Sequence, residues 1–418
     1  MDNAYSYLNS LGLHKIKPGL GRIKKLLESL GNPHNRVPGI IVGGTNGKGS
    51  AAAAIASMLR AGGYRTGLYT SPHLIDVTER IRIYGREIER SELARILLRV
   101  KRASEKSTGG SASYFETLTA SAFVYFAESG VDFSVLEVGM GGRWDATNVI
   151  TPLVSVITNV SKDHTDYLGK RIEEIASEKA RIIKPGVPAV TCARGKALRV
   201  IAEYALRQGA PLRVYGRDFK SSGESADSFD YTGSVWTLKG LSSNLSGHYQ
   251  TENLSAAVSA VEALYEHHGI KLGEKSLRKG LGAIEWPGRL ETIRKHPPLI
   301  LDSAHNPGGA KALAESLKLM YPSLRFTFLV GMLTDKDHSS FINELVPIAG
   351  KFIATEIESE RALSAEVLAR KISRIFQGPV VVGKDYRKAY RELIDEGEPA
   401  CIAGSLYLTG AIKALRGS

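Results

Sequence analysis

Short apolar runs alternate with longer stretches of helical periodicity along this chain, and no other feature constrains the fold as strongly. Each apolar run ends in a turn that contains glycine, as Gly39 to Gly43 and Leu153 to Asn159 do. Alternation of this kind is typical of parallel strands that are joined by helices. The sequence therefore predicts an α/β protein.

The predicted elements of the first part of the chain come in a regular order. The strands are expected at Gly39 to Gly43, Thr66 to Thr70, Phe133 to Val138, Leu153 to Asn159 and Pro188 to Cys192, and the helices at Ser50 to Ala61, Glu116 to Glu128, Ile172 to Ile183 and Thr251 to His268. Between Leu212 and Gly247 the pieces LRVYG, FDYTG and SVWTLKG are short and β-like. We expect them to be antiparallel strands that close the first domain.

A second alternating series follows the proline-containing segment EWPGRLETIRKHPP. Its strands are expected at Leu299 to Asp302, Phe326 to Val330, Phe352 to Thr355, Val380 to Val382 and Ala400 to Ala403. A chain of 418 residues with 43% hydrophobic content is long and apolar enough for two cores. We predict a P-loop-type, mostly parallel domain with flanking helices and a small antiparallel extension at 1–293, and a smaller Rossmann-like α/β domain at 294–418.

Composition narrows the class of protein further. The formal charge of +12 suits acidic partners, but lysine and arginine are spread along the chain, which favours a solvated basic surface over a nucleic-acid groove. No apolar run approaches the roughly 20 residues needed to cross a bilayer, and the first residues lack the pattern of a signal peptide. Cys192 and Cys401 lie outside any CxxC spacing and are expected to be core thiols. We expect a cytoplasmic protein without nucleic-acid or membrane partners.

The segment GTNGKGS at Gly44 to Ser50 lies between a predicted strand and an alanine-rich helix. Glycines let backbone N–H groups converge on phosphate oxygens, the helix N-terminus adds positive potential, and Lys48 neutralises charge. The spacing departs from GxxxxGK[ST], because Val42 stands five residues before Gly47 and Gly49 separates Lys48 from Ser50. We interpret the segment as a variant phosphate-binding loop.

Glu137 is expected at the carboxyl end of its strand, where open parallel sheets place their ligands. A carboxylate there is a hard oxygen ligand for Mg²⁺, although a simple surface charge at the end of a strand would have the same sequence. His164 follows the next predicted strand. An isolated histidine is usually packed or on the surface.

The loop GTNGKGS resembles that of the Mur ligase superfamily, and further segments resemble the folylpolyglutamate synthase and dihydrofolate synthase family within it. These segments are KPGL (17–20), TSPHL (70–74), SYFETLT (113–119), LEVGMGGRWDATN (136–148), KDH (162–164), EKARIIKPG (178–186), GHYQTEN (247–253), WPGRLE (286–291), DSAHNPGG (302–309), DKD (335–337) and GSLYLTG (404–410). They span both predicted domains in the order of the family.

The resemblance implies an ATP-dependent ligase that joins L-glutamate to dihydropteroate, to a reduced folate or to both through an acyl phosphate. It implies two Mg²⁺ ions, with K⁺ as a further candidate ion, and a monomer by analogy. The implied nucleotide contacts are Gly44, Thr45, Asn46, Gly47, Lys48, Gly49, Ser50, Asn253, Arg289, Asp302 and His305. Capping roles for Asn253 and Asp302 and a solvent-facing charge for Arg289 are the structural alternatives.

Metal and catalytic roles are implied in the same way. Ser50, Ser71 and Glu137 would hold one Mg²⁺ and His164 a second, with Lys48, Glu137, His164 and Lys179 as the catalytic set. Lys179 of EKA is expected to be carbamylated, which turns an ammonium into a carboxylate that supports the second metal. The alternative for Lys179 is an ordinary lysine on a helix surface.

Pterin-side contacts are implied for three segments: Lys17, Pro18, Gly19 and Leu20; Phe115, Glu116, Thr117 and Leu118; and Trp144, Asp145 and Ala146. Trp144 departs from the family, which commonly has a smaller residue there, and its indole could stack on a pterin or fill a gap in the core. Ser303 also departs from the usual Gly or Ala, and its sequence context explains nothing about it.

Two other functions compete with this interpretation. One keeps the Mur-type mechanism but uses a different pterin or a peptide-like acid as the acceptor. The other is a nucleotide-binding or nucleic-acid-binding protein without ligase activity, which the loop and the positive charge alone would support. The candidate metal ligands Ser71, Glu137 and His164 argue against that last possibility.

Overall fold

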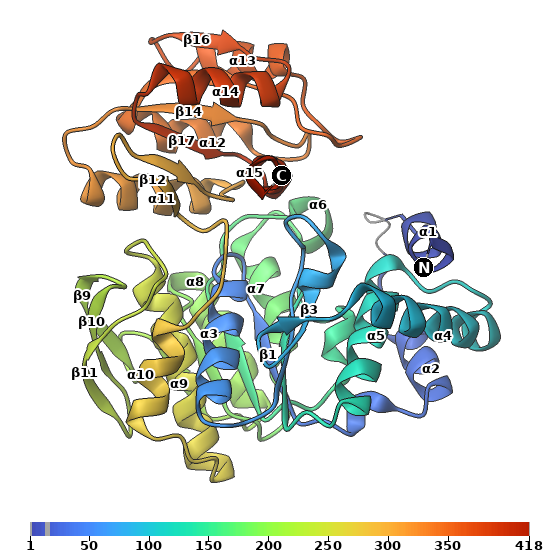
Figure 1. The fold of residues 1–418 in the computed structure, drawn as a ribbon. Helices are drawn as coiled ribbons and strands as arrows, with labels where there is room; N and C mark the ends of the chain where they lie inside the picture. Colours follow the sequence, from blue (N-terminus) through green and yellow to red (C-terminus); the bar gives the residue numbers. More distant parts are fainter. Residues whose placement is uncertain (1, 13–16, 418) are drawn as a thin grey trace. The chain divides into compact units, whose positions relative to one another are not determined.

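The computed structural model describes residues 2–12 and 17–417, which form two compact units (Figure 1). The first unit comprises the chain up to Gly223, Ser228–Asn244 and Glu252–Glu285, and the second comprises Glu224–Asp227, Leu245–Thr251 and the chain from Trp286 onward. The predicted boundary at residue 294 falls inside β12 (Glu291–Arg294), which pairs with β13 (Leu299–Leu301). The second unit therefore begins earlier than predicted, because the linker itself enters the sheet.

The first unit is built on a sheet in which β1 (Gly39–Gly43) is an inner strand. β1 pairs in parallel with β5 (Phe133–Glu137) on one side and with β6 (Val154–Ile157) on the other. The full order is β4-β3-β2-β5-β1-β6-β7-β8, with β2 (Thr66–Tyr69), β3 (Ile81–Ile83), β4 (Arg86–Glu87), β7 (Ala189–Thr191) and β8 (Leu212–Val214). Only β3 and β4 run antiparallel to their neighbours.

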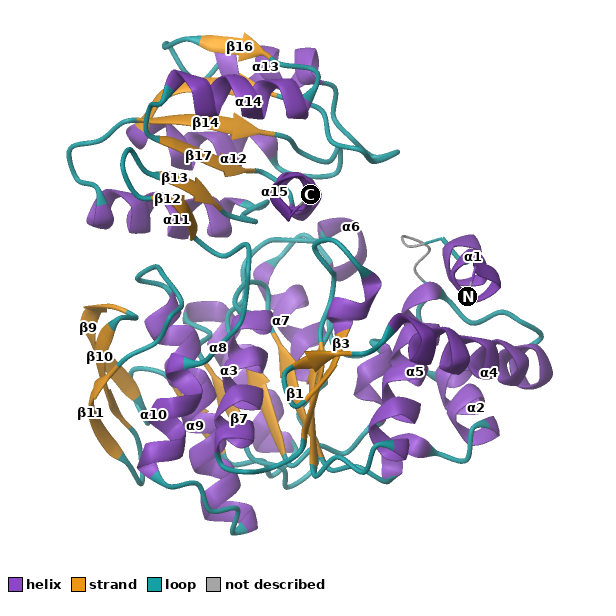
Figure 2. Ribbon diagram, in the orientation of Figure 1, coloured by secondary structure: helices purple, strands orange, loops and turns teal. Residues whose placement is uncertain are grey.

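Helices cover both faces of this sheet (Figure 2). The described helices are α1 (Asp2–Ser10), α2 (Gly21–Ser29), α3 (Lys48–Ala61), α4 (Arg90–Thr108), α5 (Tyr114–Glu128), α6 (Thr165–Leu168), α7 (Ile172–Ala180), α8 (Gly195–Arg207), α9 (Gln250–His268) and α10 (Glu274–Gly282), with 3-10 turns η1 (Pro33–Asn35), η2 (Val77–Arg80) and η3 (Ala146–Val149). Tyr69 and Leu136 pack with α2, α4 and α5, and Ile41 packs with α7 and α8. Both faces are buried, as a parallel sheet requires.

The segment Leu212–Val214 corrects one prediction. It was expected to be antiparallel, but it pairs in parallel with β7 and extends the large sheet as β8. The helix α8 lies between β7 and β8 in the chain and returns it to the same end of the sheet, which is how parallel neighbours are connected. Three short strands, β9 (Lys220–Ser225), β10 (Ser228–Thr232) and β11 (Thr237–Leu241), form a separate small sheet. The predicted pieces FDYTG and SVWTLKG overlap β10 and β11, whereas β9 was not predicted.

A buried ion pair joins β8 of the large sheet to α9, and the small sheet contacts the same carboxylate through Tyr231. Glu262 is fully buried and lies 2.7 Å from Arg213 Nη1. The same carboxylate accepts hydrogen bonds from the Tyr231 hydroxyl at 3.1 Å and from the backbone N–H groups of Val235 and Trp236 at 2.8 and 2.6 Å. With so many donors the buried charge of Glu262 is compensated, as burial of a carboxylate demands.

The second unit contains a smaller sheet in the order β12-β13-β17-β14-β15-β16. Its further strands are β14 (Phe326–Val330), β15 (Ala349–Ala354), β16 (Val380–Val382) and β17 (Ala400–Ala403), and its helices are α11 (Pro307–Met320), α12 (His338–Leu345), α13 (Ala365–Ser373), α14 (Tyr386–Glu396) and α15 (Leu406–Gly417), with the turn η4 (Val346–Ile348). All pairs except β12–β13 are parallel. The predicted fold class is confirmed in both units.

Two further predictions concern single side chains and membrane spans. Cys192 and Cys401 are buried and not joined in a disulfide, so the prediction of core thiols is confirmed. Burial raises the pKa of both thiols, which keeps them protonated. Among the described helices, none has both the length and the apolar character that crossing a bilayer requires.

The close contact between α10 and α3 gives a test of the packing. A Cβ atom on Gly280 would lie 2.5 Å from Met58 Cα, and the Ser57 hydroxyl donates to the Gly280 carbonyl at 2.7 Å. We expect Gly280→Ala to lower the free energy of unfolding by about 1–3 kcal/mol, because the two helices must separate. Gly282→Ala is the matched control, since no atom lies within 4 Å of its Cβ position. Urea unfolding checks both, and equal stabilities of the two variants would contradict this packing.

Candidate functional site

The carboxyl ends of four neighbouring strands bring the predicted site residues of the first unit together. Register pairs Val42 with Glu137, Tyr69 with Leu136, and Gly43 with Ile157. The phosphate loop after β1 therefore lies between Glu137 at the end of β5 and the segment after β6. Open parallel sheets bind ligands at this edge.

Two glycines give the loop its shape. Gly44 has a φ of +139°, and a Cβ there would lie 2.0 Å from Thr158 Oγ1. Gly47 has a φ of +82°, and a Cβ there would lie 2.1 Å from Asn253 Oδ1. A side chain at either position would be strained and would collide, so glycine is required for both reasons. Gly47 also precedes the first residue of α3, so the loop passes directly into a helix N-terminus.

Residues after β6 hold the loop from the other side. The Thr45 N–H donates to the Asn159 carbonyl at 2.8 Å, and the Asn46 N–H donates to Asn159 Oδ1 at 3.0 Å. Asn159 Nδ2 and the Thr158 hydroxyl both donate to the Asn46 carbonyl. Sequence reasoning did not single out Thr158 or Asn159. Their place directly after a strand parallel to β1 was the available signal.

Two lysines converge on carbonyl groups of the loop. Lys48 Nζ donates to the Thr45 carbonyl at 3.0 Å, and Lys179 Nζ donates to the Gly44 carbonyl at 2.6 Å. Lys179 is buried, and burial, together with the positive charge of Lys48, lowers its pKa to about 7, although Asp163 and Asp145 oppose the shift. The alternative that Lys179 is an ordinary lysine on a helix surface is therefore wrong. A neutral amine is readily populated there near neutral pH.

The donor set around Glu137 suits a hard cation. The Glu137 side chain is buried at the end of β5 and accepts the Ser71 N–H at 3.1 Å, which places the Ser71 segment beside the carboxylate. Ser50 is buried in the first turn of α3. Carboxylate and hydroxyl oxygens are the ligands that Mg²⁺ prefers. These residues therefore fit the metal that the sequence predicted.

His164 lies after β6, with a φ of +50° at the start of α6. Its side chain is 39% exposed, and Nε2 lies 4.0 Å from Asp163 Oδ2. The described residues contain no cluster of three or more His, Cys, Asp or Glu side chains that could by itself hold a metal. A second metal at His164 would thus need oxygen ligands from other groups, and this assignment stays a prediction.

A single carboxylate, that of Glu79, holds the loop that carries Ser71. Glu79 accepts hydrogen bonds from three successive backbone N–H groups, those of Leu74 at 2.8 Å, Ile75 at 2.7 Å and Asp76 at 2.8 Å. Arg80 Nε donates to His73 Nδ1 at 2.9 Å. Sequence reasoning did not select Glu79, because its partners are backbone groups. The contacts hold the loop beside Glu137.

The implied pterin residues divide into two groups. Phe115 packs against the backbone of the loop after β5, where a Cβ on Gly139 would lie 2.7 Å from the Phe115 ring. Asp145 is buried in the same loop and accepts the Met140 N–H at 3.0 Å, and burial raises its carboxyl pKa. Trp144 is 53% exposed, with the Arg143 guanidinium 5.9 Å from its ring centroid, so it does not fill a core gap.

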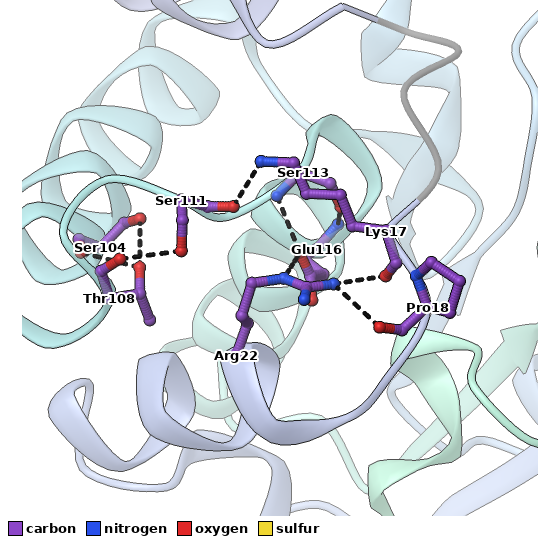
Figure 3. A network of polar contacts seen from close by, with 8 residues as sticks. All are labelled: Lys17, Pro18, Arg22, Ser104, Thr108, Ser111, Ser113 and Glu116. Carbon is purple, nitrogen blue, oxygen red and sulfur yellow. Dashed lines mark hydrogen bonds and ion pairs between the residues drawn. The ribbon is translucent and has the colours of Figure 1, made fainter.

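The other implied pterin residues have structural partners. Glu116 forms a capping box with Ser113 at the start of α5 and pairs with Arg22, while Thr117 and Leu118 are fully buried. Lys17 Nζ donates to the Ser111 carbonyl at 2.8 Å (Figure 3). Ala146 is buried in η3. The ligand roles of these residues remain predictions.

The second unit gathers Asp302, His305 and Arg289 around the end of β13. Asp302 is buried and accepts the N–H groups of Leu290 at 2.7 Å and Ala304 at 2.8 Å, and burial raises its pKa against the influence of Arg289. Ser303, which the sequence left unexplained, donates its hydroxyl to the Gly288 carbonyl at 2.8 Å. It thereby ties the Arg289 segment to the end of β13.

Comparison with known proteins places this geometry in context. Residues 42–261 match the Mur ligase middle domain, and residues 288–406 match the Mur ligase glutamate ligase domain. A dihydrofolate synthase/folylpolyglutamate synthase from Bacillus subtilis is 37% identical over 98% of both chains.

Two solved structures share the fold over nearly their whole length. Escherichia coli FolC in complex with DHPP and ADP has a TM-score of 0.91 and 29% identity, covering 100% of this chain and 97% of the other. A bifunctional folylpolyglutamate synthase/dihydrofolate synthase from Yersinia pestis, complexed with AMPPNP and Mn ion, has a TM-score of 0.89 and 30% identity, covering 100% and 98%.

The lowered pKa of Lys179 predicts how stability depends on pH. An unfolded lysine binds its proton up to about pH 10.4, whereas buried Lys179 releases it near pH 7. Between these values the unfolded chain binds more protons, so the free energy of unfolding should rise with pH by up to about 1.4 kcal/mol per unit. Lys179→Met has no such group, and subtracting its urea-unfolding profile isolates the effect. Parallel profiles from pH 7 to 10, in metal-free and carbonate-free buffer, would contradict the shift.

Proposed function

The chain belongs to the dihydrofolate synthase/folylpolyglutamate synthase family of Mur ligases, and from this premise we propose how its residues carry out the reaction. It is an ATP-dependent ligase that joins L-glutamate to a folate-type carboxylate. One observation carries the assignment of the site: the glycine loop with Lys48 and the Glu137 carboxylate lie at the carboxyl ends of adjacent parallel strands, and buried Lys179 of α7 contacts the same loop.

The loop Gly44 to Ser50 binds the triphosphate in this proposal. Its backbone N–H groups and the N-terminus of α3 supply fixed positive potential, and Lys48 supplies a full charge. Lys48 is only partly buried, so its ammonium can leave the Thr45 carbonyl and reach a phosphate oxygen. Asn253 contacts the loop at Gly47 and is assigned to the nucleotide on the same grounds.

Ser50, Ser71 and Glu137 would hold Mg²⁺, which when bound neutralises charge on the transferring phosphoryl group. The buried Glu137 carboxylate lies beside the loop, and Glu79 keeps the Ser71 segment in place. Arg289, Asp302 and His305 are proposed to bind the nucleotide from the second unit. Their segments are fixed by Ser303 and by the N–H groups of Leu290 and Ala304.

The chemistry requires two displacements. A carboxylate oxygen of the organic acid attacks the γ-phosphorus, and the bond from that phosphorus to ADP breaks. The amino group of glutamate then attacks the acyl carbon, phosphate leaves, and the amine loses a proton. Fixed donors at the loop stabilise the charge that develops in the first step, which is where such sites supply most of their rate enhancement.

The acceptor acid is proposed to be dihydropteroate, a reduced folate or both. Phe115 presents an aromatic ring beside Asp145 and the loop after β5, and Trp144 adds an exposed indole on the same loop. Flat heteroaromatic rings bind well against such side chains. A Mur-type ligase for another pterin or a peptide-like acid is the alternative that the acceptor assay must exclude.

Phosphate release with different acceptors tests the function. With ATP, Mg²⁺ and glutamate present, we expect release to require dihydropteroate or tetrahydrofolate, because only an activated acid can accept the amine. Lys48→Ala should lower turnover by about 100-fold or more, the loss of roughly 3 kcal/mol of transition-state stabilisation. Lys170→Ala, at an exposed lysine between α6 and α7, is the control with wild-type turnover.

Labelling the carboxylate of the acid with oxygen-18 tests whether the reaction passes through an acyl phosphate. An acyl phosphate leaves one carboxylate oxygen in the released phosphate, so mass spectrometry of the phosphate should show one label per turnover. Glutamate-dependent turnover with another acid alone would favour the alternative acceptor. Turnover without label transfer would overturn the acyl-phosphate route.

Lys179 is proposed to be carbamylated. A buried amine with a pKa lowered to about 7 is neutral, and therefore nucleophilic, in a substantial fraction of molecules at neutral pH, and CO₂ adds to neutral amines with loss of a proton. The product is a carboxylate that could support a metal near His164. High-resolution density at Lys179, or intact mass under non-denaturing conditions in bicarbonate buffer, should show the added CO₂, and Lys179→Met should lack it. A plain ammonium in crystals that contain the bound metal would refute the modification.

The remaining proposals concern the bound ions, the oligomeric state, the location in the cell and the partners of the protein. We propose two divalent ions per active site, with K⁺ as a candidate monovalent ion, and a monomer that works in the cytoplasm without nucleic-acid partners. The charge of +12 supports anionic small-molecule substrates, namely ATP, glutamate and the organic acid.

A further inference from the structure

The strand β16 leaves one edge of the second sheet open. It lies at the outer end of the strand order and, among the described strands, pairs only with β15 (Figure 1). The carbonyl of Pro379 accepts a hydrogen bond from β15 at 3.0 Å, and the N–H of Gly383 donates to β15 at 2.9 Å. Because the backbone groups of successive residues point to opposite sides of a strand, those of Val380 and Val382 point away from β15. Both residues therefore offer a donor and an acceptor to a strand added at this edge.

A groove of about 470 Å³ lies between this edge strand and α13. Its volume falls within the range of roughly 300–1,000 Å³ that is usual for binding clefts. Val380 and Val382 line the groove from β16, and Val382 is 44% exposed. The lining residues of α13 are spaced three and four apart and so share one face of the helix: Glu366, Ala369, Arg370, Ser373 and Arg374. The groove thus joins apolar side chains and open backbone groups on one wall to a polar helix face on the other.

The polar wall of the groove carries an excess of positive charge. Glu366 is its acidic lining residue, and the Lys384 ammonium pairs with that carboxylate at 2.5 Å and compensates its charge. The side chains of Arg370 and Arg374 are exposed, and neither forms an ion pair among the described residues. These two residues lie one helical turn apart, which separates them by about 6 Å along α13. A partner that fills the groove should therefore present negative charge to this wall.

An extended peptide matches both walls of the groove. A strand added to β16 would bond to the open backbone groups of Val380 and Val382, and its alternate side chains would face α13. Alternate residues of a strand are about 6.6–6.8 Å apart, which is close to the roughly 6 Å between Arg370 and Arg374 along the helix. A carboxylate at each of two alternate positions would thus meet one guanidinium, and such pairs form charge-assisted hydrogen bonds.

We propose that this groove binds an extended acidic segment of a partner protein, which adds a strand to β16 and places carboxylates two residues apart against Arg370 and Arg374. Strand addition of this kind takes affinity from the backbone and specificity from alternate side chains. A second copy of the chain suits the groove less well, because it would bring the same two arginines to the same edge. No groove residue belongs to the proposed ligase site, so the inference does not depend on the proposed function.

Fluorescence anisotropy of short labelled peptides with the full chain tests the charge recognition. The probe alternates glutamate with valine. One comparison peptide has lysine in place of glutamate, and another has the composition of the probe with its glutamates grouped together. We expect the probe to bind about 10-fold more tightly than either, and Arg374→Glu to weaken it about 10-fold or more, because the charge of the wall is reversed. Arg391→Glu is the matched control with an unchanged Kd, since exposed Arg391 lies on α14, which packs on the opposite face of the sheet.

Proline substitutions and amide exchange test the backbone contacts. Val382→Pro removes an N–H that points away from β15, so the melting temperature should change little while the Kd for the probe rises about 10-fold or more. Val381→Pro removes an N–H that faces β15, and it should lower the melting temperature. In the unsubstituted chain, NMR should show that the probe slows hydrogen exchange at the amides of Val380 and Val382.

The proposal is overturned if the chain does not bind the probe, or if it binds the glutamate and lysine peptides equally. Binding that Arg374→Glu leaves unchanged would exclude recognition by this wall of the groove. Binding without slower exchange at the amides of Val380 and Val382 would exclude strand addition. If light scattering shows a dimer that Val382→Pro abolishes, a second copy of the chain occupies the edge, and the acidic partner is wrong.

Discussion

The parallel pairing of β1 between β5 and β6 is the constraint on which the site depends. Backbone hydrogen bonds fix the register of the three strands, and that register sets Glu137 beside Val42 and Thr158 just beyond Gly43. Each strand ends at the same edge, so short loops suffice to bring a carboxylate, a lysine and helix-terminal N–H groups together. A shift of one residue in β5 would turn Glu137 to the opposite face of the sheet.

Long-range contacts then determine the shape of the phosphate loop. The loop has little room to relax, because Thr158 approaches Gly44 and Asn253 approaches Gly47 so closely that no Cβ fits at either glycine. Thr158 follows β6, and Asn253 belongs to α9, about two hundred residues further along the chain than the loop. The binding conformation is therefore a property of the folded first unit as a whole, and mutations in α9 should affect it as directly as mutations in the loop.

Periodicity and motifs predicted the elements of regular structure and the edge at which the site lies. They failed where tertiary context decides. LRVYG has the composition of an antiparallel strand, and only the crossover through α8 makes it parallel. The linker near Arg294 has the composition of a domain boundary, yet it enters a sheet as β12. Glu79, Thr158 and Asn159 were missed because they act on backbone groups, for which side-chain identity is a weak signal. Ser303 was explained only when its partner, the Gly288 carbonyl, was seen.

Electrostatics explains why the two lysines of the loop have different tasks. Both ammonium groups donate to loop carbonyls, and the positive charge of Lys48 disfavours a charge on buried Lys179. Lys48 is partly exposed at the start of α3 and keeps the freedom to move toward a phosphate, whereas Lys179 is buried and cannot follow it. The mutual repulsion falls when an anion enters or when Lys179 becomes neutral or negatively charged. Because the two ammonium groups repel each other most when no anion is bound, binding of the polyanionic substrate also relieves this repulsion. The folded sheet around the site supplies the stability that holds the two lysines together.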